Sequence, residues 1–159
     1  MRNENRKWKL KKLTDIKRRD KVVAYKYVRR VKYHETDQMG VAHHANYLHW
    51  FEEARTEYLR EQGVSYRELE ENGVIMPVAE VNCSYHQPAY YDDQVTIITK
   101  IKELKRVKVS FEYEVKRGDD LLLTGSSLHP FVDEDFKPLP LKRKKPELWE
   151  KIFKTVDNV

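Results

Sequence analysis

The residues best suited to chemistry lie between Tyr33 and Arg60, in the string YHETDQMGVAHHANYLHWFEEARTEYLR. Asp37 falls in a short polar segment that Gly40 can turn tightly, and a strongly apolar helical pattern follows at once. The first turn of a helix carries backbone N–H groups without intrahelical partners, which can bind a developing oxyanion. A carboxylate held beside those groups can act on whatever they bind. The stretch is therefore a candidate catalytic site.

The elements that would position Asp37 follow from the hydrophobic pattern. Residues 22–33 are rich in Val and Tyr and predict a strand, residues 34–42 a loop, and residues 43–62 a helix with a broad apolar face that Gly63 ends. Ser65 and Glu68 form a capping-box pattern for a short second helix. From Met76 onward, four strand-like segments with short connections predict an antiparallel meander, with a hairpin turn at residues 118–120. This is an α+β order of elements.

Charge is distributed unevenly along the 159 residues, which are enough for one domain. Residues 1–32 hold 14 Lys and Arg against 3 acidic residues, residues 33–136 hold 10 against 20, and residues 137–159 hold 7 against 3. We therefore expect a basic N-terminal arm over residues 1–21, a main domain over residues 22–140, and a basic tail over residues 141–159 with a short helix from Pro146.

The lone cysteine, Cys83, excludes an internal disulfide and a cysteine-rich zinc site. No apolar run approaches the roughly 20 residues that a membrane helix needs, and no signal-peptide core follows the basic N-terminus. The expected location is the cytoplasm. The basic arm is interpreted first as solvated charge, with contact to an anionic membrane surface as the weaker alternative, and no nucleic-acid partner is expected.

Several motifs resemble those of one known family. The strings TD-x-x-G-V, H-x-N-Y and W-F-E-x-A-R-x-E-Y-L, followed by VNCSYHQPAYYDD, resemble the 4-hydroxybenzoyl-CoA thioesterase-like family, especially its YbgC-type acyl-CoA thioesterases. The resemblance runs from about residue 27 to residue 140. It implies a hotdog fold, in which a curved antiparallel sheet of about five strands wraps around one long helix. It also implies hydrolysis of an acyl thioester to a free acid and coenzyme A, without a cofactor other than the coenzyme A of the substrate.

The resemblance further implies roles for individual residues. Asp37 corresponds to the catalytic carboxylate, acting as nucleophile or as general base on water, and the backbone amide of His44 corresponds to the oxyanion donor. On its residue type alone, Asp37 could equally cap the helix or shape the turn. A homodimer or homotetramer with active sites between subunits is implied. The substrate-binding candidates are Gly40, Val41, Asn46, Tyr47, Tyr33, Met76 and Val78, and the candidates for the CoA phosphates are Lys105, Arg106, Lys108 and Arg143.

Other residues offer alternative chemistry. His43, His44 and His49 lack the spacing of metal ligands on a helix, so we expect no metal site. Glu52 and Glu53 are the next catalytic candidates if Asp37 fails, although pairing on the helix surface, for instance of Glu52 with Arg55, is the simpler interpretation.

Three alternative functions remain open. An acidic acyl carrier protein could replace coenzyme A in the substrate, which would suit the basic ends of the chain. A non-catalytic hotdog module that binds acyl thioesters or partner proteins is the second alternative. The third is a nucleic-acid or membrane-surface binder that works through residues 1–32. A hotdog dehydratase is not favoured, because its usual helix-borne His and carboxylate pattern is not evident.

Overall fold

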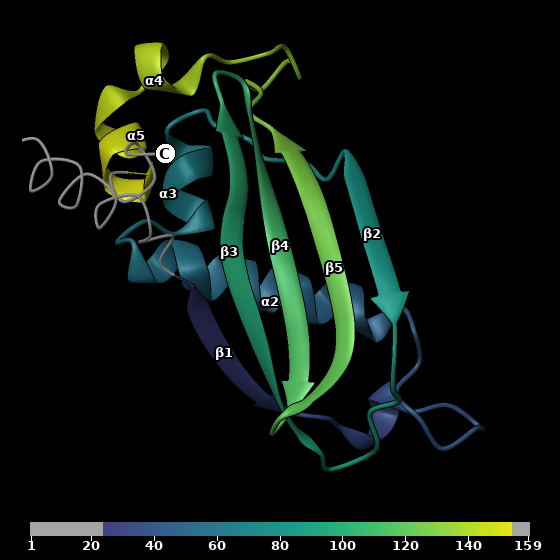
Figure 1. The fold of residues 1–159 in the computed structure, drawn as a ribbon. Helices are drawn as coiled ribbons and strands as arrows, with labels where there is room; N and C mark the ends of the chain where they lie inside the picture. Colours follow the sequence, from purple (N-terminus) through teal and green to yellow (C-terminus); the bar gives the residue numbers. More distant parts are fainter. Residues whose placement is uncertain (1–23, 154–159) are drawn as a thin grey trace, which may run out of the picture.

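The computed structural model describes residues 24–153, and in that part of the chain five strands form one curved antiparallel sheet (Figure 1). The predicted basic arm, residues 1–21, lies outside the described residues. The elements in chain order are β1 (Tyr25–Arg30), η1 (Tyr33–Glu35), α2 (Asn46–Glu61), α3 (Tyr66–Glu71), β2 (Glu80–Tyr85), β3 (Gln94–Lys105), β4 (Lys108–Arg117), β5 (Asp120–Pro130), α4 (Leu141–Lys144) and α5 (Pro146–Phe153).

The strands are arranged in the order β1-β3-β4-β5-β2. The hairpins β3–β4 and β4–β5 are as predicted, and the β4–β5 turn falls at residues 118–119. The predicted four-strand meander is wrong for β2, which pairs with β5 through Cys83 and Gly125, while β1 pairs with β3. The connection over residues 86–93 is long enough to cross the end of the sheet, about 15 Å for three strand spacings. A sequence pattern that identifies strands does not by itself specify which strands pair with one another.

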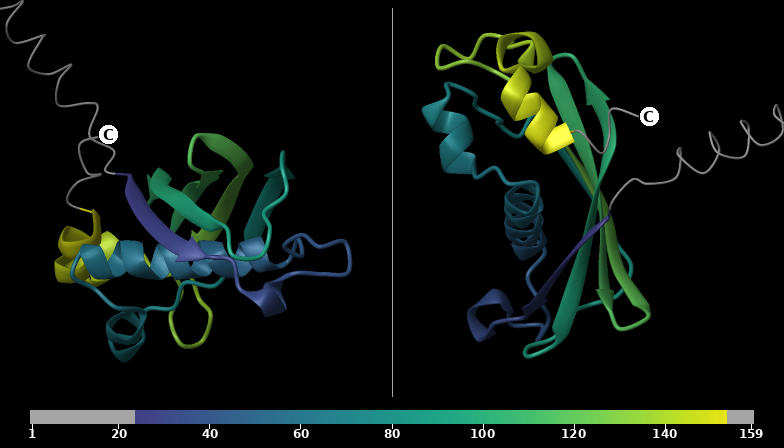
Figure 2. Two further views of the ribbon diagram at one scale, coloured as in Figure 1. Left: turned by 90° about the horizontal axis from the view of Figure 1, so that it is seen from below. Right: turned by 90° about the vertical axis from the view of Figure 1, so that its left-hand side faces the viewer.

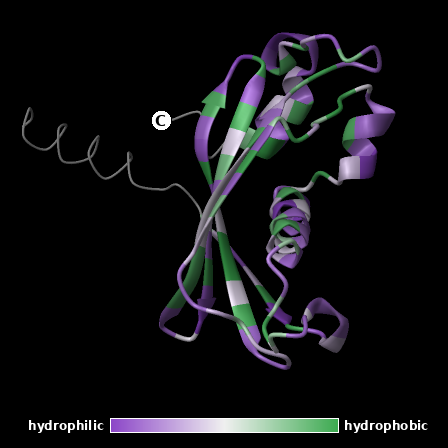
Figure 3. Ribbon diagram, turned by 90° about the vertical axis from the view of Figure 1, so that its right-hand side faces the viewer, coloured by the Kyte–Doolittle hydropathy of each residue, from purple (hydrophilic) through white to green (hydrophobic). Residues whose placement is uncertain are grey.

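The helix α2 lies across the concave face of the sheet. Figure 2 shows α2, α3, α4 and α5 all on this one side. Burial alternates along β3 and β4, as expected for strands with one covered face, and the hydropathy of the strands alternates with it (Figure 3). The ring of Phe51 on α2 stacks on Tyr113 of β4 at 4.1 Å between centroids. On the neighbouring strand β5, Gly125 has no side chain, which leaves the space that the Phe51 ring occupies.

The ends of the helices follow local signals with one exception. Ser65 Oγ accepts a hydrogen bond from the Glu68 N–H at 3.1 Å, which confirms the predicted cap of α3. Gly63 follows α2 with φ +84°, in the left-handed region that favours glycine. However, α2 begins at Asn46, three residues later than predicted, because the His43 carbonyl accepts from the Asn46 N–H at 2.9 Å, which closes a tight i→i+3 turn ahead of the first α-helical turn.

The chain beyond β5 returns to the core. The helix predicted from Pro146 is present as α5, and Lys151 on it pairs with Glu68 of α3 at 3.0 Å. The ring of Phe153 packs against Phe131 at 5.9 Å. Among the described residues, no helix is long and apolar enough to cross a membrane. The buried side chains of α5 are Leu148, Trp149, Ile152 and Phe153.

A chain of buried polar groups runs through the core beneath α2. Arg55 is buried and donates to the hydroxyl groups of Tyr66 (2.9 Å) and Tyr113 (3.1 Å), so its predicted pairing with Glu52 is wrong. The Tyr113 hydroxyl is 2.7 Å from Ser127 Oγ, which is 2.7 Å from His129 Nε2. Burial, together with the charge of Arg55, lowers the pKa of His129 to about 4.

We expect this histidine to make the fold sensitive to mild acid. Because the pKa of His129 is lower in the folded chain than its ordinary 6.5, the unfolded chain binds the proton first as pH falls. The free energy of unfolding should therefore fall from pH 6.5 toward pH 4, by up to about 3 kcal/mol. Urea unfolding at fixed protein concentration measures this loss.

The control is His129→Gln, which keeps hydrogen-bonding groups but does not titrate. Its free energy of unfolding should be nearly constant between pH 6.5 and about 5.5. Below that range Glu35, Asp93 and Glu103 also contribute, because their pKa values are lowered in the folded chain. An equal slope in both proteins above about pH 5.5 would contradict the assignment to His129.

Candidate active site

Asp37 lies at the start of a tight turn that is held together by backbone hydrogen bonds. Thr36 and Ala42 form a bridge at its base, and inside it the Asp37 N–H donates to the Val41 carbonyl at 3.0 Å. The Gly40 N–H donates to the Asp37 carbonyl at 2.9 Å, and Gly40 has φ +77°. A residue with a side chain is strained at that angle, which explains the glycine.

Within the turn, only one of the two oxygen atoms of the Asp37 carboxylate is hydrogen-bonded. Oδ1 accepts a hydrogen bond from the Met39 N–H at 2.8 Å. Oδ2 has no hydrogen-bond partner in the part of the chain that the structure describes. One oxygen therefore fixes the orientation of the side chain, while the other is available to a substrate or a water molecule.

A backbone amide at the start of α2 is also available. The His43 N–H donates to the Glu35 carbonyl at 2.8 Å, and the His43 carbonyl accepts from the Asn46 N–H at 2.9 Å, so the peptides on either side of His43 are fixed. Among the described residues, the His44 N–H donates to no acceptor. It lies two residues ahead of α2, where the positive end of the helix dipole favours negative charge.

Asp37 and His44 line the same hollow, of about 310 Å³. One wall comes from the turn and the start of α2. The other wall comes from the end of β2 and the residues after it. Burial raises the pKa of Tyr85 to about 12, so its hydroxyl stays protonated and donates to the His44 carbonyl at 3.0 Å. The complete lining is Asp37, Met39, Val41, Ala42, His44, Tyr47, Tyr85, His86, Gln87 and Pro88.

Two other candidates from the sequence help to build this hollow. The side chain of Asn46 bonds across the loop, as the sequence suggested, and donates to the Glu35 carbonyl at 2.7 Å. Tyr47 is buried, and its hydroxyl accepts from the Ala89 N–H at 3.3 Å while its ring packs edge to face with Tyr85 at 5.4 Å. Asn46 thus holds the loop, and Tyr47 joins the core to the hollow.

Three expected lining residues lie elsewhere in this chain. Tyr33 is 78% exposed and contacts Tyr91 in a second hollow beside β1. Met76 is buried in the core, and Val78 is exposed just before β2. None of the three lines the hollow of Asp37.

The cationic candidates lie at the far end of the sheet. Lys105, Arg106 and Lys108 surround the β3–β4 turn, and Arg143 is on α4 near it (Figure 1). The segment before β3 touches the Asp37 turn through the Val41–Tyr90 bridge, so these residues are separated from Asp37 by the length of β3, about 35 Å. Within one chain they do not join the candidate site.

The alternative carboxylates are also outside this hollow. Glu53 pairs with Arg29 at 3.3 Å and accepts from the Tyr27 hydroxyl at 3.1 Å, which holds it toward β1. Glu52 is exposed on α2. In residues 24–153, no three His, Cys, Asp or Glu side chains gather as metal ligands would.

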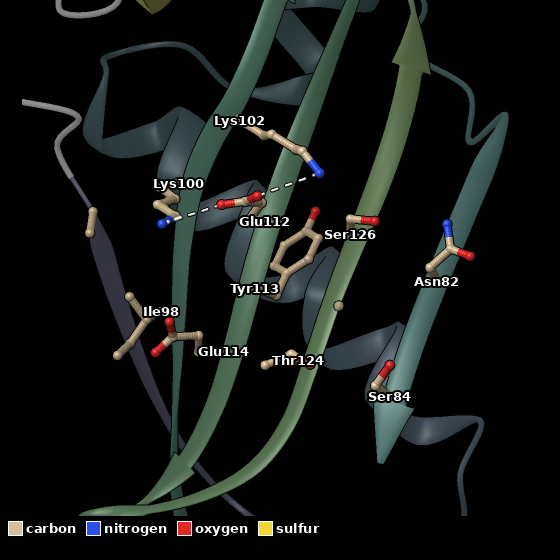
Figure 4. Close-up of a pocket in the computed structure, with 12 residues that line it drawn as sticks. Asn82, Ser84, Ile98, Lys100, Lys102, Glu112, Tyr113, Glu114, Thr124 and Ser126 are labelled. Carbon is tan, nitrogen blue, oxygen red and sulfur yellow. Dashed lines mark ion pairs between the residues drawn. The ribbon is translucent and has the colours of Figure 1, made fainter. Parts of the chain in front are cut away.

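A larger hollow of about 480 Å³ lies on the opposite face of the sheet from α2 (Figure 4). Its charges are paired, since Glu112 contacts both Lys100 and Lys102 at 3.2 and 3.6 Å. It contains neither Asp37 nor His44 and offers no evident reacting group. We therefore place the candidate chemistry in the smaller hollow.

The sequence did not identify the wall formed by Tyr85, His86, Gln87 and Pro88 as part of the site. These residues lie within the string VNCSYHQPAYYDD, so the resemblance was the available signal. It also overlooked Glu35, the buried carboxylate two residues before Asp37. A charged residue in a polar loop is expected to be solvated, and only the fold shows that this one is enclosed.

Comparison with known proteins adds a family relationship. Residues 39–124 match the thioesterase superfamily, a match that begins two residues after Asp37. YneP of Bacillus subtilis is 36% identical over 119 residues, which are 74% of this chain and 86% of YneP. The acyl-CoA thioesterase YbgC of Haemophilus influenzae is 38% identical over 58% of this chain and 69% of its own length.

A solved structure of a DHNA-CoA thioesterase from Staphylococcus aureus superposes with a TM-score of 0.79. The two chains are 34% identical, and the superposition covers 84% of this chain and 91% of the other. The fold and the sequence therefore point to the same group of proteins.

Proposed function

This chain belongs to the thioesterase superfamily, and from that premise we propose that it hydrolyses acyl-CoA thioesters to a free acid and coenzyme A. The hotdog fold expected from the sequence is confirmed. The observation that carries the proposal is the shared hollow of Asp37 and His44, with one free carboxylate oxygen and one free amide N–H.

The proposed chemistry needs little more than these two groups. The His44 N–H would donate to the thioester oxygen as it gains negative charge, with help from the dipole of α2. Asp37 would either attack the carbonyl carbon, giving an anhydride that water then hydrolyses, or take a proton from an attacking water molecule. In both routes the carbon–sulfur bond breaks and the thiolate leaves. A thiol pKa of about 8.5 makes that departure easy without a strong general acid.

We propose a small or aromatic acyl group as the substrate. The hollow, about 310 Å³, lies at the lower end of the range for ligand pockets. Tyr47 and Tyr85 supply aromatic surface, while His86 and Gln87 supply polar groups that could bond to a ring substituent. The similarity to the Staphylococcus aureus DHNA-CoA thioesterase supports the same choice.

We further propose that the active unit is a homodimer or a homotetramer. The outer edge of β2 has no partner strand among the described residues, and Val81 and Tyr85 on it are 41% and 49% exposed. Pairing of two such edges would close the hollow and bring a second set of side chains to it. A second copy is also the route by which Lys105, Arg106, Lys108 or Arg143 could reach the CoA phosphates. A solution mass equal to one 19.2 kDa chain would contradict this proposal.

An acyl carrier protein is the second candidate for the thiol part of the substrate. Lys105 and Arg106 at the β3–β4 turn and Arg143 on the neighbouring α4 provide a basic surface that suits an acidic partner. The proposed compartment is the cytoplasm, which is consistent with the free thiol of Cys83.

A substrate panel tests the proposed activity. Thiol release is measured with short, long and aromatic acyl-CoAs, and with the same acyl groups on a carrier protein. We expect turnover of at least one aromatic or short acyl-CoA. Faster hydrolysis on the carrier protein would favour the second candidate. Absence of hydrolysis across both panels would contradict the thioesterase proposal and favour a binding module.

A further inference from the structure

The carboxylate of Glu35 is enclosed by three hydrogen-bond donors, which come from β1, from α2 and from the residue just before η1. Oε1 accepts from Arg29 Nη2 of β1 at 2.7 Å and from Trp50 Nε1 of α2 at 3.0 Å. Oε2 accepts from the Lys32 N–H, just before η1, at 2.8 Å. Glu35 is only 5% exposed. Burial by itself would raise its pKa, but the hydrogen bonds and the charge of Arg29 outweigh burial and hold the pKa below its ordinary value.

The backbone carbonyl of Glu35 is hydrogen-bonded to residues at the other end of the loop. The Glu35 carbonyl accepts from the His43 N–H at 2.8 Å and from Asn46 Nδ2 at 2.7 Å. Glu35 therefore connects the chain just before the Asp37 turn to the chain just after it. The His44 amide follows one of these anchored residues directly, and Asp37 lies two residues from Glu35 itself.

We propose that Glu35 is a positioning residue, which sets the placement of the Asp37 carboxylate relative to the His44 amide through its bonds to Arg29, Trp50 and the Lys32 amide. This rests on the proposed function. Glu35 does not line the hollow of Asp37 and His44, so it is assigned no contact with the substrate. It acts by fixing the loop, because a misplacement of about 1 Å at reacting groups can cost about a hundredfold in rate.

A neutral amide cannot replace this carboxylate, for a geometric reason. All three partners of Glu35 are donors, so the NH2 group of a glutamine would face a donor in either orientation. Glu35→Gln nearly preserves the size of the side chain while breaking at least one of these bonds. It also leaves Arg29 with Glu53 as its single carboxylate partner among the described residues.

The test is a double-mutant cycle between Glu35→Gln and Asp37→Asn. We expect Glu35→Gln to lower kcat at least tenfold and to change KM less than threefold, measured well below its melting temperature. In the Asp37→Asn background, Glu35→Gln should cost less than twofold, because its effect operates through Asp37. Effects that multiply, or a kcat equal to that of the wild type, would overturn the proposal.

Tyr113→Phe is the matched control for lost stability. It removes a buried hydroxyl that bonds to Arg55 and Ser127, far from the loop, so it should lower the melting temperature and leave kcat unchanged. If Glu35→Gln fails to fold, Trp50→Phe removes one donor to Glu35 and keeps an aromatic ring. It should lower kcat in the same direction by a smaller factor, and an unchanged kcat would count against the proposal.

Hydrogen exchange gives a readout that needs no activity. The His43 amide is bonded to the Glu35 carbonyl and the Asp37 amide to the Val41 carbonyl. Both amides should exchange at least tenfold faster in Glu35→Gln than in Tyr113→Phe. Equal exchange in the two variants would overturn the positioning role, whereas an inactive wild type with faster loop exchange in Glu35→Gln would contradict only the proposed function.

Discussion

Asp37→Asn is expected to lower kcat/KM for thiol release at least about a hundredfold, the scale of a lost catalytic carboxylate. The substitution removes the negative charge and the nucleophilic or basic oxygen. It keeps an amide oxygen that can still accept from the Met39 N–H, so the turn should be preserved. The melting temperature should accordingly remain within a few degrees of the wild type.

Asp92→Asn is the matched control for that experiment. Asp92 is also a turn aspartate, and it pairs with Arg30 at 3.4 Å on the exposed side of the connection to β3. It does not line the hollow of Asp37, so its loss should leave kcat/KM unchanged. Retention of activity in Asp37→Asn would contradict the assigned role and make Glu52 and Glu53 the next candidates.

Gly125→Val is expected to cost the largest amount of stability of any single change proposed. A Cβ atom at this position would lie 2.5 Å from the Phe51 ring and 2.8 Å from the Asn82 carbonyl oxygen. Both are far inside van der Waals contact, so α2 must move away from β5. Overpacking of this kind costs about 2–3 kcal/mol, which corresponds to a fall of roughly 5–10 °C in the melting temperature.

Ser126→Val, on the same strand as Gly125, is the control that distinguishes overpacking from an effect of strand propensity. Ser126 lies on the opposite face of the sheet, in the open hollow of Figure 4, where a β-branched residue is tolerated in a strand. Its melting temperature should change little. Phe51→Leu should recover part of the stability lost in Gly125→Val, because it removes the ring and leaves the contact with the Asn82 carbonyl. An unchanged melting temperature in Gly125→Val would contradict the close packing of α2 on β5.

Local patterns in the sequence were sufficient for most of the elements. The apolar spacing identified α2, Ser65 and Glu68 marked the start of α3, and the turn at Gly118 fixed the β4–β5 hairpin. These features depend on neighbours within a few residues, which is the range over which periodicity, capping and turn preferences act. The motifs around Asp37 also led to the family, although the role of Asp37 stays a prediction.

Contacts between distant residues were decided by the tertiary structure. The sequence alone did not place β2 beside β5, and so did not bring Tyr85 to the His44 carbonyl. It also did not single out Glu35, and it offered Tyr33 as a candidate for substrate binding, whereas Tyr33 lies outside the hollow of Asp37 in this chain. Burial of Glu35 requires donors from β1 and α2 to converge on it, and these donors lie far from it in the sequence or on another element. The sequence by itself determined most of the elements and nominated the candidate reacting groups, whereas the fold decided their partners, because pairing and burial depend on residues far apart in the chain.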